Sequence, residues 1–365
     1  MAVFDRIGED DHEQVVFCHD RATGLRAVIA IHSTHLGPAL GGTRFYPYAT
    51  EDDALVDVLC LARAMTYKAA VAGLDLGGGK AVIIGDPTTT RTDALIRAYG
   101  RHVDALGGRY LTAEDVGTAQ ADMDLIRAET TSVTGMSESL GGSGDPSAPT
   151  AYGVTWAMKA VARHLWGDPS LAGRHVVVSG VGKVGGHLVA HLVAEGARVT
   201  VADIDDAAVA GAVTDHGARA VPVADAHRVE CDIFSPCAMG AVLDAPTIAE
   251  LGCAAVVGSA NNQLADADSA ALLAKAGVTY ATDYVVNAGG LINIADELAP
   301  GGYDRERAHA AVQKIFDTTS ILLATAETDA VSTVEAADHL AERRMQEPGR
   351  ARLIRPVSGG SPWPE

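Results

Sequence analysis

The stretch HVVVSGVGKVGG, residues 175–186, joins a short apolar run to three glycines in the spacing GxGxxG. The apolar run predicts a β-strand, and the segment after the glycines predicts a helix. A second predicted strand, residues 198–203, ends in Asp203, 18 residues after Gly185. Strand, glycine turn, helix and a second strand with a terminal acid make a βαβ unit. This order predicts a Rossmann-like, doubly wound α/β domain that binds a dinucleotide.

The residue types in this unit favour one dinucleotide over another. Glycines allow the backbone to approach a pyrophosphate at the helix N-terminus. Asp203 is expected to accept hydrogen bonds from ribose hydroxyls and to repel a 2′-phosphate, which favours NAD over NADP. Arg198 and Arg219 are near enough in the sequence to leave this preference open.

Three further predicted strands fit the same sheet; they are residues 231–235, 254–259 and 278–281. Small and amide residues follow these strands, among them Ala238, Asn262 and Asn287. The C-terminal ends of the strands are where such a sheet receives its ligand. The alternative is that the amides only cap their own turns.

A second glycine-rich stretch, GLDLGGGKAVIIGDP at residues 73–87, contains Lys80 just after three glycines. A phosphate-binding P-loop follows the pattern G-x-x-x-x-G-K-[ST]. The sequence has Leu74 where the first glycine is required and Ala81 where the hydroxyl is required. We therefore predict that Lys80 has a purpose other than holding a phosphate.

Lysine is scarce in this chain, with six lysines among 28 basic residues. Burial can shift the pKa of a lysine toward neutrality, whereas a guanidinium stays charged, so a retained lysine can serve chemistry. Thr50 is a predicted N-cap for a helix whose apolar stripe includes Met65. Lys68 follows on the same side, so Lys68 and Lys80 are predicted to converge on one pocket. Two ordinary surface lysines are the alternative that spacing alone leaves open.

The segment TAEDVGT, residues 112–118, places Asp115 between a predicted strand and a predicted helix, residues 119–127. Asp115 could be the N-cap of that helix. Alternatively, it is the anionic counterpart of the lysine pair, in which case acid–base chemistry near neutral pH becomes possible.

Composition excludes several classes of function. A net charge of −19 with only 28 lysines and arginines argues against a nucleic-acid-binding protein. No apolar run is long enough for a membrane span, and the acidic start does not resemble a signal peptide. The five cysteines contain no CxxC motif, which indicates reduced thiols and predicts no metal site. These features predict a cytoplasmic protein without a nucleic-acid or membrane partner.

The chain length predicts about two domains of ~100–200 residues each. The Gly-, Ser- and Pro-rich segment 137–150 reads as the connection between them. We predict an α/β protein with two domains around a cleft, residues 1–147 for substrate and catalysis and 148–325 for the dinucleotide. Helices at about 326–350 are expected to pack back on the first domain, and residues 351–365 are expected to form a flexible tail. A helix predicted at 303–324 would be long enough to bridge the domains.

The ordered motifs resemble one family over about residues 25 to 345. Besides the glycine motif they are GPALGGTRF (37–45), MTYKAAVAGLDLGGGKAVIIGDP (65–87), TAEDVGT (112–118), GSANNQL (258–264) and DYVVNAGGLIN (283–293). The sequence is similar to the amino-acid dehydrogenases that act on glutamate, leucine, phenylalanine and valine. It resembles most the branched-chain members of the actinobacterial valine dehydrogenase type. The resemblance implies a homo-oligomeric enzyme that uses NAD to deaminate an L-amino acid reversibly to a 2-oxo acid and ammonia.

The resemblance also implies roles for individual residues. Lys68 would hold the substrate α-carboxylate near the backbone of Gly41 and Gly42. Lys80 would polarise the oxo-acid carbonyl and activate water, and Asp115 would pass protons to and from the amino group. The expected cofactor contacts, including two asparagines that help to hold cofactor and substrate, are Thr150, Gly180, Val181, Gly182, Lys183, Val184, Gly185, Gly186, Asp203, Ala238, Asn262 and Asn287.

Substrate preference is predicted from the side-chain pocket. Glutamate-specific members of the family carry a lysine at the place of Leu40, where it pairs with the side-chain carboxylate. An apolar wall suits a branched aliphatic chain instead, and its expected members are Leu40, Met65, Ala113, Val133, Leu291 and Ile294. The sequence therefore predicts valine as the preferred substrate. A leucine- or phenylalanine-preferring enzyme and a non-catalytic NAD-binding sensor are the alternatives.

Overall fold

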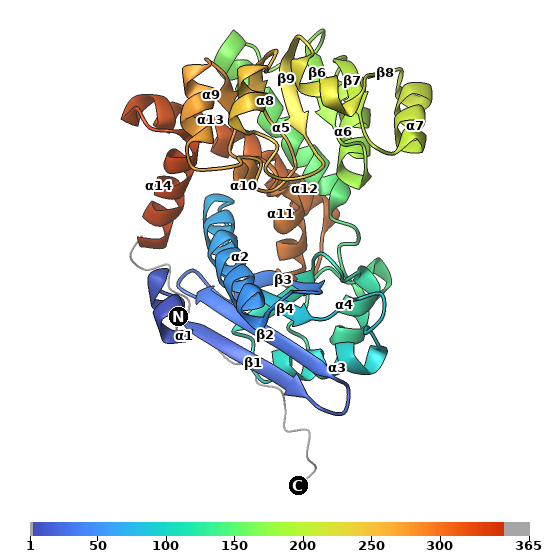
Figure 1. The fold of residues 1–365 in the computed structure, drawn as a ribbon, viewed down its shortest axis with the longest axis vertical. Helices are drawn as coiled ribbons and strands as arrows, with labels where there is room; N and C mark the ends of the chain where they lie inside the picture. Colours follow the sequence, from blue (N-terminus) through green and yellow to red (C-terminus); the bar gives the residue numbers. More distant parts are fainter. Residues whose placement is uncertain (1–2, 347–365) are drawn as a thin grey trace. The chain divides into compact units, whose positions relative to one another are not determined.

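The computed structural model describes residues 3–346 as an α/β protein with two compact units (Figure 1). The first unit comprises residues 3–145, 294–303 and 341–346, and the second comprises 146–293 and 304–340. The chain passes between the units four times, after residues 145, 293, 303 and 340. In the described part of the chain, no helix has both the length and the apolar character needed to cross a membrane.

The first boundary between the units falls after residue 145, two residues before the predicted one, and the later segments differ more. The short segment 294–303 groups with the N-terminal unit. The last helix, α14 (Thr333–Gln346), is divided after Leu340, so only its final residues group with that unit. The predicted tail, residues 351–365, lies outside the described residues.

The first unit is built on a five-stranded sheet in the order β1-β2-β4-β3-β5. Its strands are β1 (Gln14–Asp20), β2 (Leu25–Ser33), β3 (Ala39–Tyr46), β4 (Gly77–Ile84) and β5 (Tyr110–Glu114). The neighbours β4, β3 and β5 are parallel, whereas β1 and β2 pair in the antiparallel sense. Through their shared pairing with β3, the end of β5 at Glu114 is level with Ala81 in the middle of β4, next to Lys80.

Helices cover both faces of this sheet. One face is covered by α2 (Glu51–Val71), and the other by α3 (Asp93–Asp104) and α4 (Gln120–Arg127). A short helix, α1 (Val3–Glu9), precedes the first strand. The predicted N-cap of α2 is confirmed, since Thr50 and Asp53 form a reciprocal capping box. The face under α2 holds Val28, Ala30 and Val82, and the opposite face holds the larger core around Tyr99 and Tyr110.

The three glycines before Lys80, Gly77, Gly78 and Gly79, belong to β4 itself. Glycine is needed here for close packing. A Cβ on Gly78 would lie 2.0 Å from the backbone nitrogen of Thr66 in α2, and one on Gly41 would lie 1.7 Å from the carbonyl oxygen of Gly79. Glycines at these contacts let α2 and β3 approach β4 more closely than any side chain permits.

The second unit confirms the doubly wound fold. Its six strands are β6 (His175–Ser179), β7 (Arg198–Ala202), β8 (Arg219–Ala220), β9 (Cys231–Pro236), β10 (Cys253–Val256) and β11 (Thr279–Tyr280). They are all parallel in the order β11-β10-β9-β6-β7-β8. The strand order reverses between β6 and β9, which is where such sheets bind their ligand. The shorter helices of this unit are α6 (Lys183–Ala194), α7 (Asp206–His216), α8 (Ala245–Ala249), α9 (Ser269–Lys275) and α10 (Asp283–Val286).

The single helix predicted at residues 303–324 is wrong. The segment forms α12 (Arg305–Gln313) and α13 (Ile315–Asp329), with Lys314 at the break. Both helices pack on α5 (Ser147–Trp166) within the second unit. The hydrogen bond from Gln313 Nε2 to the Tyr152 hydroxyl, 2.6 Å long, is part of this contact.

Candidate active site

Lys80 and Asp115 form an ion pair at the predicted site. Lys80 Nζ lies 2.6 Å from Asp115 Oδ2, and the two side chains are 8% and 19% exposed. They reach each other from β4 and from the end of β5, with β3 in between. At this level β3 carries Gly41 and Gly42, and a Cβ on Gly42 would lie 2.9 Å from the Cβ of Asp115. The glycines of β3 therefore leave room for the two charged side chains to meet above it.

The loop after β5 fixes the backbone of Asp115. Asp115 N donates to Thr118 Oγ1 over 2.9 Å, and that hydroxyl donates to the carbonyl oxygen of Thr43 over 2.9 Å. The structure excludes the helix-capping alternative for Asp115. Instead, Ala119 is the N-cap of α4, and its N–H donates to Asp122 Oδ2 over 2.9 Å.

The environment of Asp115 favours its ionised form. Burial alone raises the pKa of this carboxyl, but the charge of Lys80 and then that of Arg44 outweigh burial, so the net pKa lies below its ordinary value. Asp115 is therefore a carboxylate at neutral pH, ready to accept a proton.

The other predicted substrate residues fall into three groups. Lys68 and Met65 lie half-buried in the last turns of α2, and Leu40 and Ala113 are buried in β3 and β5, all within the first unit. Val133 belongs to the core on the α3 face of the sheet, so the structure does not bring it to the face that carries Lys80. The last two predicted residues, Leu291 and Ile294, lie in α11 (Gly289–Ala295). The boundary between the units falls within this helix, so Leu291 belongs to the second unit and Ile294 to the first.

The glycine loop after β6 fits a pyrophosphate. Gly180 has φ +103°, and a Cβ there would lie 2.7 Å from Ala238, while one on Gly185 would lie 1.9 Å from the oxygen of Gly180. Gly182 has φ −67° and open space around its Cβ position. Packing and backbone conformation explain why residues 180 and 185 are glycines. The open space at Gly182 leaves room for an outside group to approach the backbone there. Of the flanking predicted residues, Val181 is buried, Val184 and Gly186 are half-buried, and Lys183 is exposed.

Asp203, at the end of β7, is anchored to this loop. Its carboxylate accepts hydrogen bonds from Val181 N, at 2.6 Å, and from Asp205 N, at 2.9 Å. Arg198 begins β7, and Arg219 is in register with Thr200, so both lie several residues before Asp203 along the sheet.

The amide loops meet at Asn287, which is 4% exposed. Asn287 Nδ2 donates to the Ser259 oxygen over 3.1 Å and to Asn261 Oδ1 over 2.7 Å. Asn262 is exposed at φ +52°, a conformation that asparagine tolerates. Thr150, in the first turn of α5, donates its hydroxyl to the Pro146 oxygen and packs against Gly290.

Two family models match most of the chain. The model described as Glu/Leu/Phe/Val dehydrogenase, dimerisation domain, matches residues 12–132, and that of Glutamate/Leucine/Phenylalanine/Valine dehydrogenase matches 141–216 and 206–352. The chain belongs to this family of amino-acid dehydrogenases. The predicted resemblance is therefore confirmed.

Individual relatives of this dehydrogenase include both leucine and valine enzymes. It is 51% identical to a leucine dehydrogenase of Geobacillus stearothermophilus over 352 residues, 96% of this chain and 95% of that protein. It is 55% identical to a valine dehydrogenase of Streptomyces coelicolor over 340 residues, 92% and 93% of the two chains. Among solved structures, L-tryptophan dehydrogenase from Nostoc punctiforme aligns with a TM-score of 0.83 and 41% identity, covering 94% of this chain and 98% of that one.

Sequence reasoning missed Arg44 beside the charged pair of this dehydrogenase. Arg44 Nε lies 3.5 Å from Asp115 Oδ2, and Arg44 Nη1 lies 2.8 Å from Asp57 Oδ2. The available signal was that Arg44 is the only charged residue in β3, ALGGTRFY, a strand that is otherwise almost entirely buried. Asn261 was missed as well, because Asn262 beside it has the same residue type.

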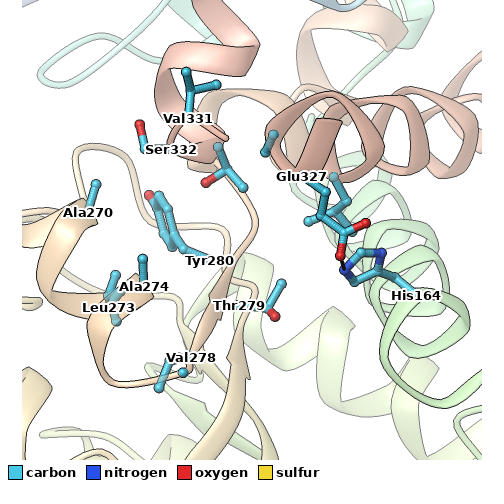
Figure 2. A pocket seen from close by; sticks show the side chains of 14 residues that line it. His164, Ala270, Leu273, Ala274, Val278, Thr279, Tyr280, Glu327, Val331 and Ser332 are labelled. Atoms are coloured by element: carbon cyan, nitrogen blue, oxygen red, sulfur yellow. Dashed lines mark ion pairs between the residues drawn. The ribbon is translucent and has the colours of Figure 1, made fainter. Parts of the chain in front are cut away.

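A separate cavity of about 300 Å³ lies in the second unit of the dehydrogenase (Figure 2). Apolar side chains such as Leu273 and Val331 line it, and His164 Nε2 lies 3.4 Å from Glu327 Oε1 at one side. None of the predicted site residues lines this cavity.

Proposed function

We propose that this enzyme catalyses the NAD-dependent, reversible oxidative deamination of L-valine and related aliphatic L-amino acids to 2-oxo acids, ammonia and NADH. The observation that carries the proposal is the ion pair between Lys80 and Asp115, 2.6 Å long and largely shielded from solvent. NAD is the cofactor of the leucine and valine dehydrogenases of this family. The Lys80–Asp115 pair also argues against a non-catalytic sensor, which would have no need for a buried acid–base pair.

Each residue of the proposed site has its own role in the reaction. Lys68 binds the α-carboxylate of the amino acid and orients its α-carbon. When bound, NAD accepts a hydride from that carbon. Asp115 takes a proton from the substrate amino group, which its ionised state permits. Lys80 hydrogen-bonds the oxygen of the attacking water and later that of the product carbonyl.

The expected cofactor preference follows from Asp203. We expect kcat/KM with NAD to exceed that with NADP at least about tenfold, because like charges in contact cost about 1–4 kcal/mol near a protein surface. Asp203→Ser should lower the ratio of kcat/KM with NAD to kcat/KM with NADP. Asp206→Ser, the same change at the start of α7, should leave this ratio unchanged. Equal kcat/KM values for the two cofactors in the unaltered enzyme would contradict this prediction.

The pocket proposed for the substrate side chain is apolar. Leu40 is completely buried, and Ala113 is almost completely buried. Met65, three residues before Lys68, is half-buried. A glutamate side chain placed against Leu40 would be buried without a charge partner, at a cost of several kcal/mol. We propose that Ile294, which belongs to the same unit, shortens the pocket. We leave Val133 out of it because its side chain packs in the core on the other face.

A panel of L-amino acids tests this proposal. Valine should give the highest kcat/KM, with leucine, isoleucine and 2-aminobutyrate within about two orders of magnitude, because one methylene changes binding by only ~1–3 kcal/mol. Glutamate should be close to inactive. NADH formation measured for each amino acid at saturating NAD gives the ranking. Efficient turnover of glutamate, or phenylalanine exceeding valine, would rule out the proposed pocket, and leucine in first place would favour the leucine dehydrogenase alternative.

The enzyme is also proposed to be a cytoplasmic homo-oligomer of two or more subunits. Residues 12–132 match a model described as a dimerisation domain, and all five cysteines lie in the described chain as free thiols. Light scattering of the purified enzyme would give its mass in solution, and a monomer would contradict the proposed assembly.

A further inference from the structure

Arg44 extends from β3 on the same face of the sheet as Lys80. Its neighbour Thr43 points to the opposite face, where its hydroxyl lies 2.6 Å from that of Tyr99. Successive residues of a strand alternate between faces, and Arg44 is in register with Val82, which packs under α2. Arg44, Val82 and Lys80 therefore share the face covered by α2.

The guanidinium of Arg44 lies between two carboxylates. Nη1 contacts Asp57 Oδ2 over 2.8 Å, and Nε lies 3.5 Å from Asp115 Oδ2. Tyr48 donates its hydroxyl to the same oxygen of Asp57. A continuous series of polar contacts thus runs from Tyr48 through Asp57 and Arg44 to Asp115, ending at Lys80.

Lys80 and Arg44 converge on one oxygen of Asp115, at 2.6 and 3.5 Å. In the proposed reaction Lys80 must hydrogen-bond the substrate oxygen, which weakens its hold on Asp115. A buried carboxylate that loses its cation becomes costly and tends to take up a proton. Arg44 keeps its charge at every accessible pH and does not take part in the reaction. It supplies a second cation that stays beside Asp115 throughout the cycle.

We propose that Arg44, held in place by Asp57, is a positioning residue that keeps the carboxylate of Asp115 oriented and ionised while Lys80 engages the substrate. The inference rests on the proposed function, because it concerns the same acid–base pair. The groups that face Asp115 agree with it. Burial raises the pKa of this carboxyl, whereas Lys80 on β4, Arg44 on β3 and the backbone N–H of Val116 lower it.

The test is the pH dependence of kcat for valine in Arg44→Met, because kcat reports groups in the substrate complex. The change keeps an unbranched side chain and removes its charge. We expect the acid limb to move up by about 1–3 pH units, as removal of a neighbouring opposite charge does for a carboxyl. We also expect kcat to fall about tenfold to a hundredfold through misplacement of Asp115. Arg26→Met is the matched control, since it removes a half-exposed arginine from β2 and its ion pair with Glu51. Its pH profile should equal that of the unaltered enzyme.

The outcomes separate the inference from the proposed function. If the unaltered enzyme does not oxidise valine, the proposed function fails, and the comparison is repeated with whichever amino acid the panel identifies. If Arg44→Met binds NADH and melts normally but keeps the original kcat and pH profile, the inference alone is overturned. If Arg44→Met does not fold, the kcat of Arg44→Lys tests the inference instead, because a lysine keeps the charge but cannot contact both carboxylates. It should lower kcat at least about threefold at an unchanged melting temperature, and an unchanged kcat would overturn the inference.

Discussion

Replacement of Lys80 by alanine is expected to lower kcat for amino-acid deamination by about 10²–10⁴-fold, the usual effect of removing a positioned acid–base group. NAD binding should survive, because Lys80 lies in the first unit and the glycine loop after β6 lies in the second. The loss should appear in kcat at saturating substrate, since Lys80 is proposed to act on the reacting oxygen. Steady-state NADH formation gives kcat, and the fluorescence of bound NADH gives the cofactor affinity.

A matched control for this variant is Lys275→Ala, which removes an exposed lysine from the last turn of α9. It should have the kcat of the unaltered enzyme. A folded Lys80→Ala enzyme with near-normal turnover would contradict the assignment of Lys80, and loss of NADH binding in that variant would show that the change is not local.

Substitution of Gly78 by alanine should have the largest effect on stability. The new Cβ would lie 2.0 Å from the nitrogen, 2.2 Å from Oγ1 and 2.5 Å from Cα of Thr66. Two of these atoms belong to the backbone of α2, so the helix itself must move. Movement of α2 would also displace Lys68, two residues after Thr66. We expect the free energy of unfolding to fall by about 3 kcal/mol or more, at or above the upper end of the usual cost of overpacking, and activity to fall with it.

Denaturant unfolding of the purified variant measures this loss. Gly211→Ala is the control, because Gly211 lies within α7 and a Cβ there would meet no atom within 4 Å. That change should be neutral or stabilise the protein by about 0.5–1 kcal/mol. A Gly78→Ala variant as stable as Gly211→Ala would show that the contact between α2 and β4 is not as tight as described.

The dinucleotide-binding fold could be predicted from sequence because its signals are local and ordered. The apolar run before Gly180, the glycine spacing and the acid at Asp203 all lie within one βαβ unit, and each agrees with the others. The rules for connections between parallel strands then leave few possible positions for the remaining strands of the sheet. The N-cap at Thr50 was predictable for the same reason, since a capping box involves only neighbouring residues.

The parts that sequence did not predict depend on partners far along the chain. Glycines usually favour turns, but Gly78 lies in a strand because α2 must approach it. An apolar residue such as Val133 does not reveal which face of a sheet it joins. The two interpretations of Asp115 could be separated only when the loop to Ala119 was seen, and the role of Arg44 depends on contacts 13 residues away at Asp57. The break at Lys314 has no glycine or proline to indicate it.

The four passages of the chain between the units bear on how the protein is made. Synthesis proceeds from the N-terminus, so residues 3–145 emerge first but lack two of their partners. One of these is the segment 294–303, in which the carboxylate of Glu297 accepts hydrogen bonds from the backbone N–H groups of Gly135 and Ser143. The other is the end of α14, where Arg344 pairs with Asp75. On the ribosome, the unit that begins the chain is therefore completed last, after the dinucleotide-binding unit has been translated.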